Sequence, residues 1–560
     1  MNQFQFDCYL SPELKPLAKK VEKSPVTIEY EENIYDNTHI NILFKINFDS
    51  LTEEEREEIQ TIIVELSSIQ SENILPMISL DLYEDVDDVN KFKVECLFTY
   101  PRTIRQYYEN NVVLEDELKS NIHDIVEIYK IVVSQKLPVE LTFSTVSFAS
   151  FRNQKLPFPQ ICITPYAFIN GFLQRKKNEN ISYYKSFEMI FRELNKKVFE
   201  ITGKEELNDI IDVLKEDKDA LKIINNNKFI KEVKQFMKIK SFDIDSFKFV
   251  SNLGDGTFGN VYKVMNKKTK KIYALKQAKE DENNENANTL HKEAFVLDKL
   301  KHPNIVQCHG FAESMKDIVY DTYELYSSYY MLIEFCDKGD LLSYICNNYL
   351  ENENSFEDND DEPQQRRIPV ETIENIIGQM MAGCFYLHDK RIVHRDWKLE
   401  NILINKFEPF FWIKISDFGF SRTDDILLKS IAGSPYTADP NILYNEYYTD
   451  RSELFSIGCI FYSLVYLKYP CDDCENYDDI YDKVTNDEIT YPEFPGSENY
   501  KHIIELTQKL LNVDRRTIDS VVINAEKVWN EFKSNEFIVY CMKKVASLFE
   551  KYYPDGKYDE

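Results

Sequence analysis

The sequence predicts an α+β protein whose two halves follow different patterns. Residues 1–240 combine strand-like and helical segments but contain only Gly171 and Gly203 of the 14 glycines. From residue 246 onward, short strand-like stretches that contain glycine give way to long helical ones. Because glycine lets backbone N–H groups come close to a phosphate, we do not expect a nucleotide site in the first half.

The composition is that of a globular protein with a strong acidic excess. The chain has 560 residues and a formal net charge of −29, a length that suits roughly three or four domains. This charge argues against nucleic-acid or anionic-membrane surfaces, which need basic patches, and suits basic protein partners or simple solubility. The N-terminus has no apolar leader, and no long uncharged apolar run follows it. We therefore expect a cytoplasmic protein without a membrane span.

The 11 cysteines are scattered along the chain, which fits free thiols in a reducing compartment. Only Cys471 and Cys474 form a C-x-x-C pair, and no second pair with zinc-like spacing lies nearby. We do not expect a metal or redox site there.

The first half has strand and helix patterns but no chemical motif. β-branched and aromatic residues predict strands over 38–48, 75–83 and 91–100. An acid-rich first turn opens a predicted helix over 51–66, and apolar spacing predicts further helices over 115–135, 185–201 and 218–239. We divide this half into an α+β unit, 1–112, and a mainly helical region, 113–240. A regulatory or partner-docking module is one interpretation, and a purely structural flank is the other.

The second half opens with a glycine-rich stretch, LGDGTFGNVYKV. Gly254, Gly256 and Gly259 stand at G-x-G-x-x-G spacing, which alone fits either a dinucleotide fingerprint or a chance loop. In a dinucleotide-binding fold a helix would follow, whereas the residues after Gly259 alternate like a strand. We therefore expect a glycine-rich β-hairpin that can lie across the phosphates of a nucleotide.

A lysine and a glutamate downstream are placed to pair. Strand alternation in KIYALKQ puts Ala274 and Lys276 on one face, where a small side chain leaves room for a base and the lysine offers a cation to phosphate. Glu293 shares a helical face with Leu290 and Leu297. A carboxylate on an apolar stripe needs a partner, and Lys276 is the obvious one.

The stretch RIVHRDWKLENILIN, 391–405, sets several charged residues between apolar runs. Buried or half-buried charge is costly unless it is paired or used. Taken with GDGTFGNV, YALK, Glu293, DFG at 417–419 and GSPYTADPNIL at 433–443, this half resembles the eukaryotic-type protein kinases. The resemblance implies a bilobal kinase fold over 246–533, with a β-rich N-lobe and a helical C-lobe, followed by a helical tail at 534–560.

The resemblance also implies a role for each matching residue. Asp396 would accept or orient the proton of the substrate hydroxyl, Lys398 would steady the transferring phosphoryl group, and Lys276 and Glu293 complete the catalytic set. Asn401 and Asp417 would be ligands of Mg²⁺. The nucleotide, ATP, would lie against Leu253, Gly254, Asp255, Gly256, Thr257, Phe258, Gly259, Asn260, Val261, Ala274, Lys276, Glu334, Cys336 and Leu403. Backbone groups from Glu334 to Cys336 would bind adenine, behind Ile333.

The acceptor and the regulation follow from the same resemblance. Kinases with lysine at the position of Lys398 phosphorylate Ser or Thr, and Ser434 stands where the family has its P+1-loop Thr or Ser. Asp340 and Glu400 lie where the family recognises arginines before the acceptor, which favours basic protein substrates. Arg395 and Arg422 could bind a phosphate on Ser430 and so order the activation segment, although Ser430 can equally be an unmodified loop serine. The first half would then bind an unidentified partner.

Several positions depart from the family pattern. Asp439-Pro440-Asn441 replaces Ala-Pro-Glu, so the usual ion pair of that glutamate with an arginine, here Arg515 or Arg516, is lost. Glu453 replaces the aspartate of a long buried helix. Its side chain is one methylene longer, so its carboxylate accepts hydrogen bonds at a greater distance from the helix backbone. Trp397 and Leu399 replace the usual Leu and Pro of the catalytic loop. The alternatives are a pseudokinase scaffold that binds nucleotide without efficient transfer, and a small-molecule kinase of similar fold.

Overall fold

The computed structural model describes residues 26–32, 40–46, 52, 54, 83–84, 90–96, 102–103, 115–135, 146–149, 160–163, 183–255, 259–281, 285–350, 367–419, 422–423, 436–439, 450–474, 476–511 and 529–554. These residues belong to two compact units, Met1–Lys238 and Ile239–Glu560.

The first unit contains two antiparallel sheets. One has the order β1-β2-β4-β3 and the other the order β5-β6-β7. Their strands are β1 (Val26–Glu32), β2 (Ile40–Ile46), β3 (Tyr83–Glu84), β4 (Asn90–Cys96), β5 (Arg102–Thr103), β6 (Val146–Ala149) and β7 (Gln160–Ile163). The strands expected at 38–48 and 91–100 correspond to β2 and β4, whereas β1 was not expected. Most of the segments 75–83 and 51–66 lies outside the described residues.

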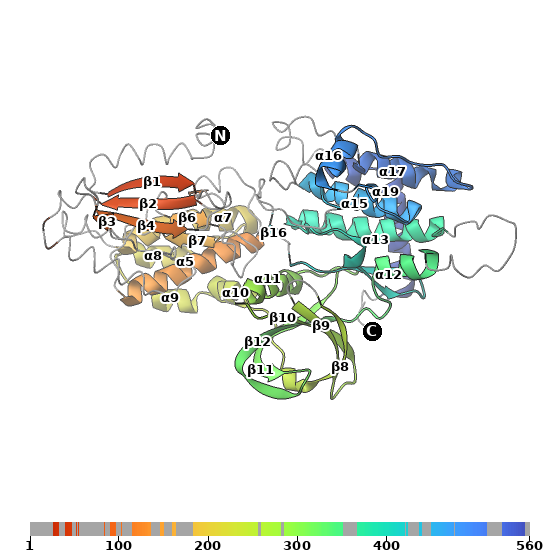
Figure 1. The fold of residues 1–560 in the computed structure, drawn as a ribbon. Helices are drawn as coiled ribbons and strands as arrows, with labels where there is room; N and C mark the ends of the chain where they lie inside the picture. The colour runs from red at the N-terminus through yellow and green to blue at the C-terminus, as the bar shows by residue number, and fades with distance from the viewer. Residues whose placement is uncertain are drawn as a thin grey trace. The chain divides into compact units, whose positions relative to one another are not determined.

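Buried side chains that come mainly from helices form a hydrophobic core among the described residues of the first unit. Figure 1 shows these helices. They are α5 (Glu115–Gln135), α7 (Tyr183–Thr202), α8 (Asn208–Lys215), α9 (Leu221–Asn226) and α10 (Lys228–Phe236). Tyr129 of α5 packs edge-to-face on Phe187 of α7, with ring centroids 4.8 Å apart. The single helix expected at 218–239 is wrong: Asn227 has an extended backbone, φ −58° and ψ 132°, and its side chain accepts the N–H of Ile230 as the N-cap of α10.

The second unit begins with a curved antiparallel sheet of order β11-β12-β10-β9-β8 (Figure 1). Its strands are β8 (Phe247–Asp255), β9 (Gly259–Asn266), β10 (Ile272–Ala278), β11 (Cys308–Asp317) and β12 (Thr322–Glu334). Helix α11 (Glu285–Lys299) packs on β10, β11 and β12. In the strand register Lys276 lies opposite Val261 and Met331, and Ala274 lies opposite Ile333.

The segment before β8 extends this sheet at its β11 edge. The N–H of Phe311 donates to the carbonyl oxygen of Lys240 at 2.8 Å, and Ser241 forms a parallel bridge with Phe311. Gly310 permits the approach, because its φ is 155° and a Cβ there would lie 2.7 Å from the Lys240 oxygen. Buried Lys316 of β11 pairs at 2.6 Å with Asp245 in the short 3₁₀ helix η3 (Ile244–Ser246). We call residues 240–246 the linker strand.

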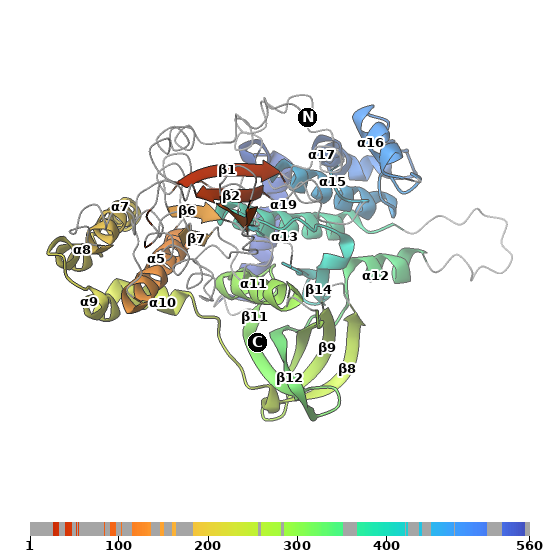
Figure 2. The ribbon, with the colours of Figure 1, turned by 60° about the vertical axis from the view of Figure 1, so that its left-hand side comes forward.

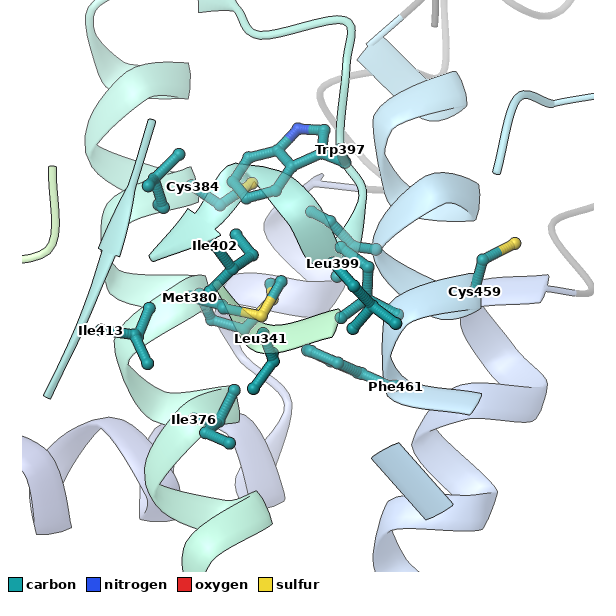
Figure 3. Packing of buried hydrophobic residues seen from close by; sticks show 14 of the residues in the cluster. Leu341, Ile376, Met380, Cys384, Trp397, Leu399, Ile402, Ile413, Cys459 and Phe461 are labelled. Carbon is teal, nitrogen blue, oxygen red and sulfur yellow. The ribbon is translucent and has the colours of Figure 1, made fainter. Parts of the chain in front are cut away.

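The C-terminal part of the second unit is helical (Figure 2). Its helices are α12 (Leu341–Ile345), the π-helical turn η4 (Cys346–Leu350), α13 (Val370–Asp389), α15 (Asp450–Tyr466), α16 (Tyr477–Thr485), η7 (Ser497–Tyr500), α17 (Lys501–Leu511) and α19 (Glu536–Tyr552). Between α13 and α15 lie β13 (Ile392–Val393), η6 (Leu399–Asn401), β14 (Ile402–Lys406), β15 (Trp412–Ile415) and β16 (Arg422–Thr423). Buried side chains of α13, α15 and the 396–415 segment form one core, in which Met380, Trp397 and Leu399 lie together (Figure 3).

Helix α19 closes this core by packing on α13. A Cβ at Gly378 of α13 would lie only 2.5 Å from the carbonyl oxygen of Cys541, so the two helix backbones are in close contact. Phe549 of α19 packs edge-to-face on Phe410 and Trp412. The side chain of Asn535 caps the helix by accepting the N–H groups of Phe537 and Ile538, both in its first turn, at 3.1 Å.

Across the described parts of the chain, no helix is both long and apolar enough to cross a membrane. The same parts contain no group of three or more His, Cys, Asp or Glu side chains able to hold a metal ion. Cys471 and Cys474 are free thiols whose pKa values are raised, mainly by burial.

Candidate active site

Three charged side chains from three elements meet between the sheet and the helical part of the second unit. The Nζ of Lys276 on β10 lies 2.8 Å from Oε2 of Glu293 on α11 and 3.1 Å from Oδ1 of Asp417, which follows β15. Strand register fixes the face of Lys276, and the apolar stripe of α11 fixes that of Glu293. The predicted pair of Lys276 and Glu293 therefore forms, and Asp417 joins it to make a triad.

The charges in this triad support one another. Burial alone would lower the pKa of Lys276, but Asp417 and Glu293 outweigh it, so the pKa of the lysine lies above its ordinary value. Burial likewise opposes ionisation of Asp417, yet Lys276 holds the pKa of that carboxyl below its usual range. For Glu293 burial is the larger effect and raises its pKa despite the lysine. The outcome is a cation flanked by one firmly ionised carboxylate that is partly open to solvent.

Glu293 also holds the segment that carries Asp417. Its Oε1 accepts the backbone N–H of Phe418 at 3.2 Å, while Oε2 binds the lysine. Asp417 has φ 62°, a left-handed backbone that is rare for a residue with a side chain. Phe418 is fully buried, with its ring edge-to-face on His394 at 4.7 Å. These contacts keep Asp417 directed at Lys276.

The catalytic-loop segment forms a second polar cluster beside the triad. Asp396 is 2 % exposed, and its Oδ2 lies 2.8 Å from both Nζ of Lys398 and Nδ2 of Asn401. The same amide nitrogen of Asn401 donates to the backbone oxygen of Asp396 at 2.8 Å. Within the described residues, Oδ1 of Asp396 is buried and has no hydrogen-bond partner. A buried acceptor without a donor is unusual and marks a position where a ligand's O–H or N–H can bind.

The glycine-rich hairpin is seen on both of its strands. Gly254 pairs with Val261, and Asp255 pairs with Asn260. A Cβ at Gly259 would lie 2.4 Å from the backbone oxygen of Gln277, so β9 can approach β10 only with glycine at this position. Leu253 is half-exposed near the tip. The tip itself, Gly256, Thr257 and Phe258, lies outside the described residues.

The end of β12 is joined to the other lobe through an ion pair of its last residue, Glu334. The N–H of Glu334 donates to the oxygen of Gln307 at 3.0 Å, so this N–H is already used within the protein. Its carboxylate binds buried Lys414 of β15 at 2.8 Å. Cys336 follows, with a thiol whose pKa burial raises. This ion pair was not expected from the sequence.

Comparison with known proteins agrees with this geometry. Residues 247–524 match the family described as protein kinase domain. This half of the chain belongs to the eukaryotic-type protein kinase superfamily, among its serine/threonine members. Of the motifs that carry the resemblance, the structure describes YALK, Glu293, RIVHRDWKLENILIN and DFG in full. It describes GDGTFGNV and GSPYTADPNIL in part.

The kinase domain has several curated relatives. Calcium-dependent protein kinase 5 of Plasmodium berghei is 30% identical over 316 residues, which are 56% of this chain and 50% of that protein. Serine/threonine-protein kinase Nek3 of Mus musculus is 30% identical over 234 residues, 40% of this chain and 39% of that protein. Serine/threonine-protein kinase D2 of Rattus norvegicus is 28% identical over 280 residues, 50% of this chain and 29% of that protein. The chain thus spans at most about half the length of these relatives.

Of the remaining residues singled out in the sequence, some lie within the described ranges and the others lie outside them. Ala274 is buried opposite Ile333, and Leu403 on β14 is partly buried and bridged to Asp340. Asp340 caps α12, accepting the N–H of Ser343 at 2.8 Å, and Glu400 is exposed. Outside the described residues lie Ser430, Ser434, Pro440, Asn441, Arg515 and Arg516, and Arg422 is described only in its backbone strand.

Proposed function

We propose that this chain is a Mg-dependent serine/threonine protein kinase that transfers the γ-phosphate of ATP to hydroxyl groups of protein substrates. The observation that carries the proposal is the simultaneous ion pairing of Lys276 with Glu293 and Asp417. Protein kinases use ATP and Mg²⁺, and catalysis in the family needs the lysine–glutamate pair and the DFG aspartate in place together.

Each polar group has a task in this proposal. Lys276 binds phosphate oxygens of the nucleotide, held in place by Glu293. Asp396 accepts or orients the proton of the acceptor hydroxyl, and its unpartnered Oδ1 supports this assignment. Lys398, 2.8 Å from Asp396, steadies the transferring phosphoryl group and balances the charge of the aspartate.

The residues present fit a magnesium ion. Both contacts of Asp417 use Oδ1, at 3.1 Å to Lys276 and 3.4 Å to the N–H of Gly419, so Oδ2 remains as an anionic ligand. The amide nitrogen of Asn401 points to Asp396, which turns its oxygen away as a neutral ligand. Oxygen ligands of this kind suit Mg²⁺, and the bound metal would neutralise charge on the phosphates.

The nucleotide and the acceptor have separate proposed surfaces. The base lies between Val261 and Ala274 on one side and Leu403 on the other, with adenine bound by backbone groups from Glu334 to Cys336. The hairpin residues Leu253, Gly254, Asp255, Gly256, Thr257, Phe258, Gly259 and Asn260 cover the phosphates. Asp340 and Glu400 favour basic residues before the Ser or Thr acceptor. The first unit is proposed as a partner-docking or regulatory module, and the free thiols of the described cysteine side chains suit the cytoplasm.

The test is transfer of radiolabel from ATP to mixed basic peptides by the full chain with Mg²⁺. Label is expected on Ser or Thr, and Asp396→Asn is expected to lower the rate by roughly 10²–10⁴-fold. The matched control is Asp389→Asn, which removes an exposed aspartate from the end of α13. Label unchanged in Asp396→Asn would reject this site. Nucleotide binding without label on any peptide would instead indicate a pseudokinase.

A further inference from the structure

One departure from the family pattern has a structural counterpart in the catalytic loop. Glu453 of α15 is 3 % exposed, and its Oε1 accepts three N–H groups. Two come from the backbone of His394 and Arg395, the latter at 3.0 Å. The third is the indole N–H of Trp397, also at 3.0 Å. Burying a carboxylate without such donors would be very costly, so this arrangement is an anchor and not a chance contact.

The anchored segment is a strained one that leads directly to the catalytic aspartate. Arg395 has φ 70°, the left-handed region that non-glycine residues seldom occupy. The two backbone N–H groups that lead into this turn, those of His394 and Arg395, bind Glu453, so the carboxylate determines how the backbone enters Asp396. A shift of the carboxylate would be passed on to the Asp396 side chain.

Trp397 restricts the carboxylate from a second direction. A glutamate has one more rotatable bond than an aspartate, so two backbone donors leave more freedom to the longer side chain. The indole N–H removes that freedom, and it can do so because Trp397 is itself held, 1 % exposed, above Cys384 of α13 (Figure 3). Its ring also lies 5.0 Å from that of His394, which contacts Phe418.

We propose that Trp397 is a positioning residue that acts through Glu453: its N–H fixes the longer carboxylate so that the strained turn at Arg395 presents Asp396 correctly. The pair replaces the leucine and aspartate usual in the family, and the two changes depend on each other. The inference rests on the proposed kinase function for its kinetic readout. It also predicts a property that is independent of activity.

The test compares Trp397→Phe with a matched control, Trp529→Phe, in the full chain. Phenylalanine keeps a buried ring but cannot donate. Trp529 is equally buried, and among the described residues its indole N–H has no partner. Its replacement therefore makes the same change from indole to phenyl without removing a hydrogen bond. Hydrogen exchange of the 391–399 segment is expected to become several-fold faster in Trp397→Phe and to stay unchanged in Trp529→Phe.

Kinetics then separate positioning from mere packing. Trp397→Phe is expected to lower kcat about tenfold, the effect of losing one hydrogen bond to a charged group, with KM for ATP unchanged. In a Glu453→Gln background the same change is expected to lower kcat less than about twofold, because the charge that the indole binds is gone.

Three results would overturn the inference. They are equal exchange rates in Trp397→Phe and wild type, an unchanged kcat in Trp397→Phe, and effects of Trp397→Phe and Glu453→Gln that multiply. Absence of phosphotransfer by the wild-type chain would count against the proposed function instead, while the exchange measurement would still decide whether the indole anchors the loop.

Discussion

Gly378→Ala tests whether α19 is packed as closely on α13 as the structure shows. A Cβ at residue 378 would meet the carbonyl oxygen of Cys541 at 2.5 Å and Cγ2 of Val545 at 2.8 Å. Since carbon–oxygen contacts settle near about 3.3 Å, α19 would have to retreat by roughly 0.8 Å. Overpacking of this kind costs about 1–3 kcal/mol, and a backbone obstacle favours the upper end, whereas alanine in a helix returns about 1 kcal/mol.

The net expectation is a loss of roughly 1–2 kcal/mol in the free energy of unfolding. Complete release of α19 would cost more, since it would expose Ile538, Val545 and Phe549 at about 1.5–3 kcal/mol each. The helix is therefore expected to shift and remain docked. Urea denaturation measures the loss, and limited proteolysis detects release.

The control is Ser547→Ala on the exposed face of α19, where better helix propensity is expected to add about 0.5 kcal/mol without a clash. If Gly378→Ala stabilised the protein by a similar amount, the close contact between the two helices would be refuted. If limited proteolysis under native conditions released α19 from the Gly378→Ala variant, the cost of overpacking would exceed the cost of undocking the helix. That result would contradict the expectation that the helix shifts and remains docked.

Three further changes probe the site and its surroundings. Glu293→Gln is expected to lower kcat/KM by at least about tenfold, because an amide cannot replace the charge facing the β10 lysine; a rate equal to wild type in peptide assays would contradict the triad. Lys414→Met leaves the carboxylate of Glu334 without its buried partner and is expected to cost about 3 kcal/mol in urea denaturation, with no loss if the pair contributes nothing. Burial lowers the pKa of His302 to about 4, and its neutral Nδ1 accepts the N–H of Asn304. The unfolded chain binds this proton near pH 6.5, so stability is expected to fall by at most about 3 kcal/mol as the pH drops from 6.5 to 4. His302→Gln is expected to flatten the dependence of stability on pH between 6.5 and 4. An unaltered profile would exclude this histidine as the cause of the loss of stability.

Much of the site could be predicted because its residues sit on regular elements whose direction the sequence reveals. Alternation along β10 assigns the face of Lys276, and helical spacing along α11 assigns that of Glu293. The order of motifs then brings in Asp417, and the structure joins all three within hydrogen-bonding distance. The sequence did not reveal that both oxygens of Glu293 are used. One of them accepts the backbone N–H of Phe418, and side-chain patterns do not show such a contact.

Contacts between distant elements were the part that pattern reasoning missed. Trp397 and Glu453 are 56 positions apart, and each was noted only as a departure from the family. Lys414 stands in a strand whose residues are all buried, which signals a hidden partner but not which one. In the first unit, apolar spacing continued across Asn227 and hid the break between α9 and α10, although three consecutive asparagines, weak helix formers, mark it.

The linker strand has a consequence for where the catalytic half can be separated from the rest. A protein cut at Phe247, where the family match begins, would lack the Lys240 oxygen that receives the Phe311 N–H, and Lys316 would lose Asp245. The rim of β11 would then offer free hydrogen-bonding groups to any neighbouring molecule, a known route to self-association. Recombinant fragments that begin before Ile239 should accordingly stay monomeric at concentrations at which the shorter ones precipitate.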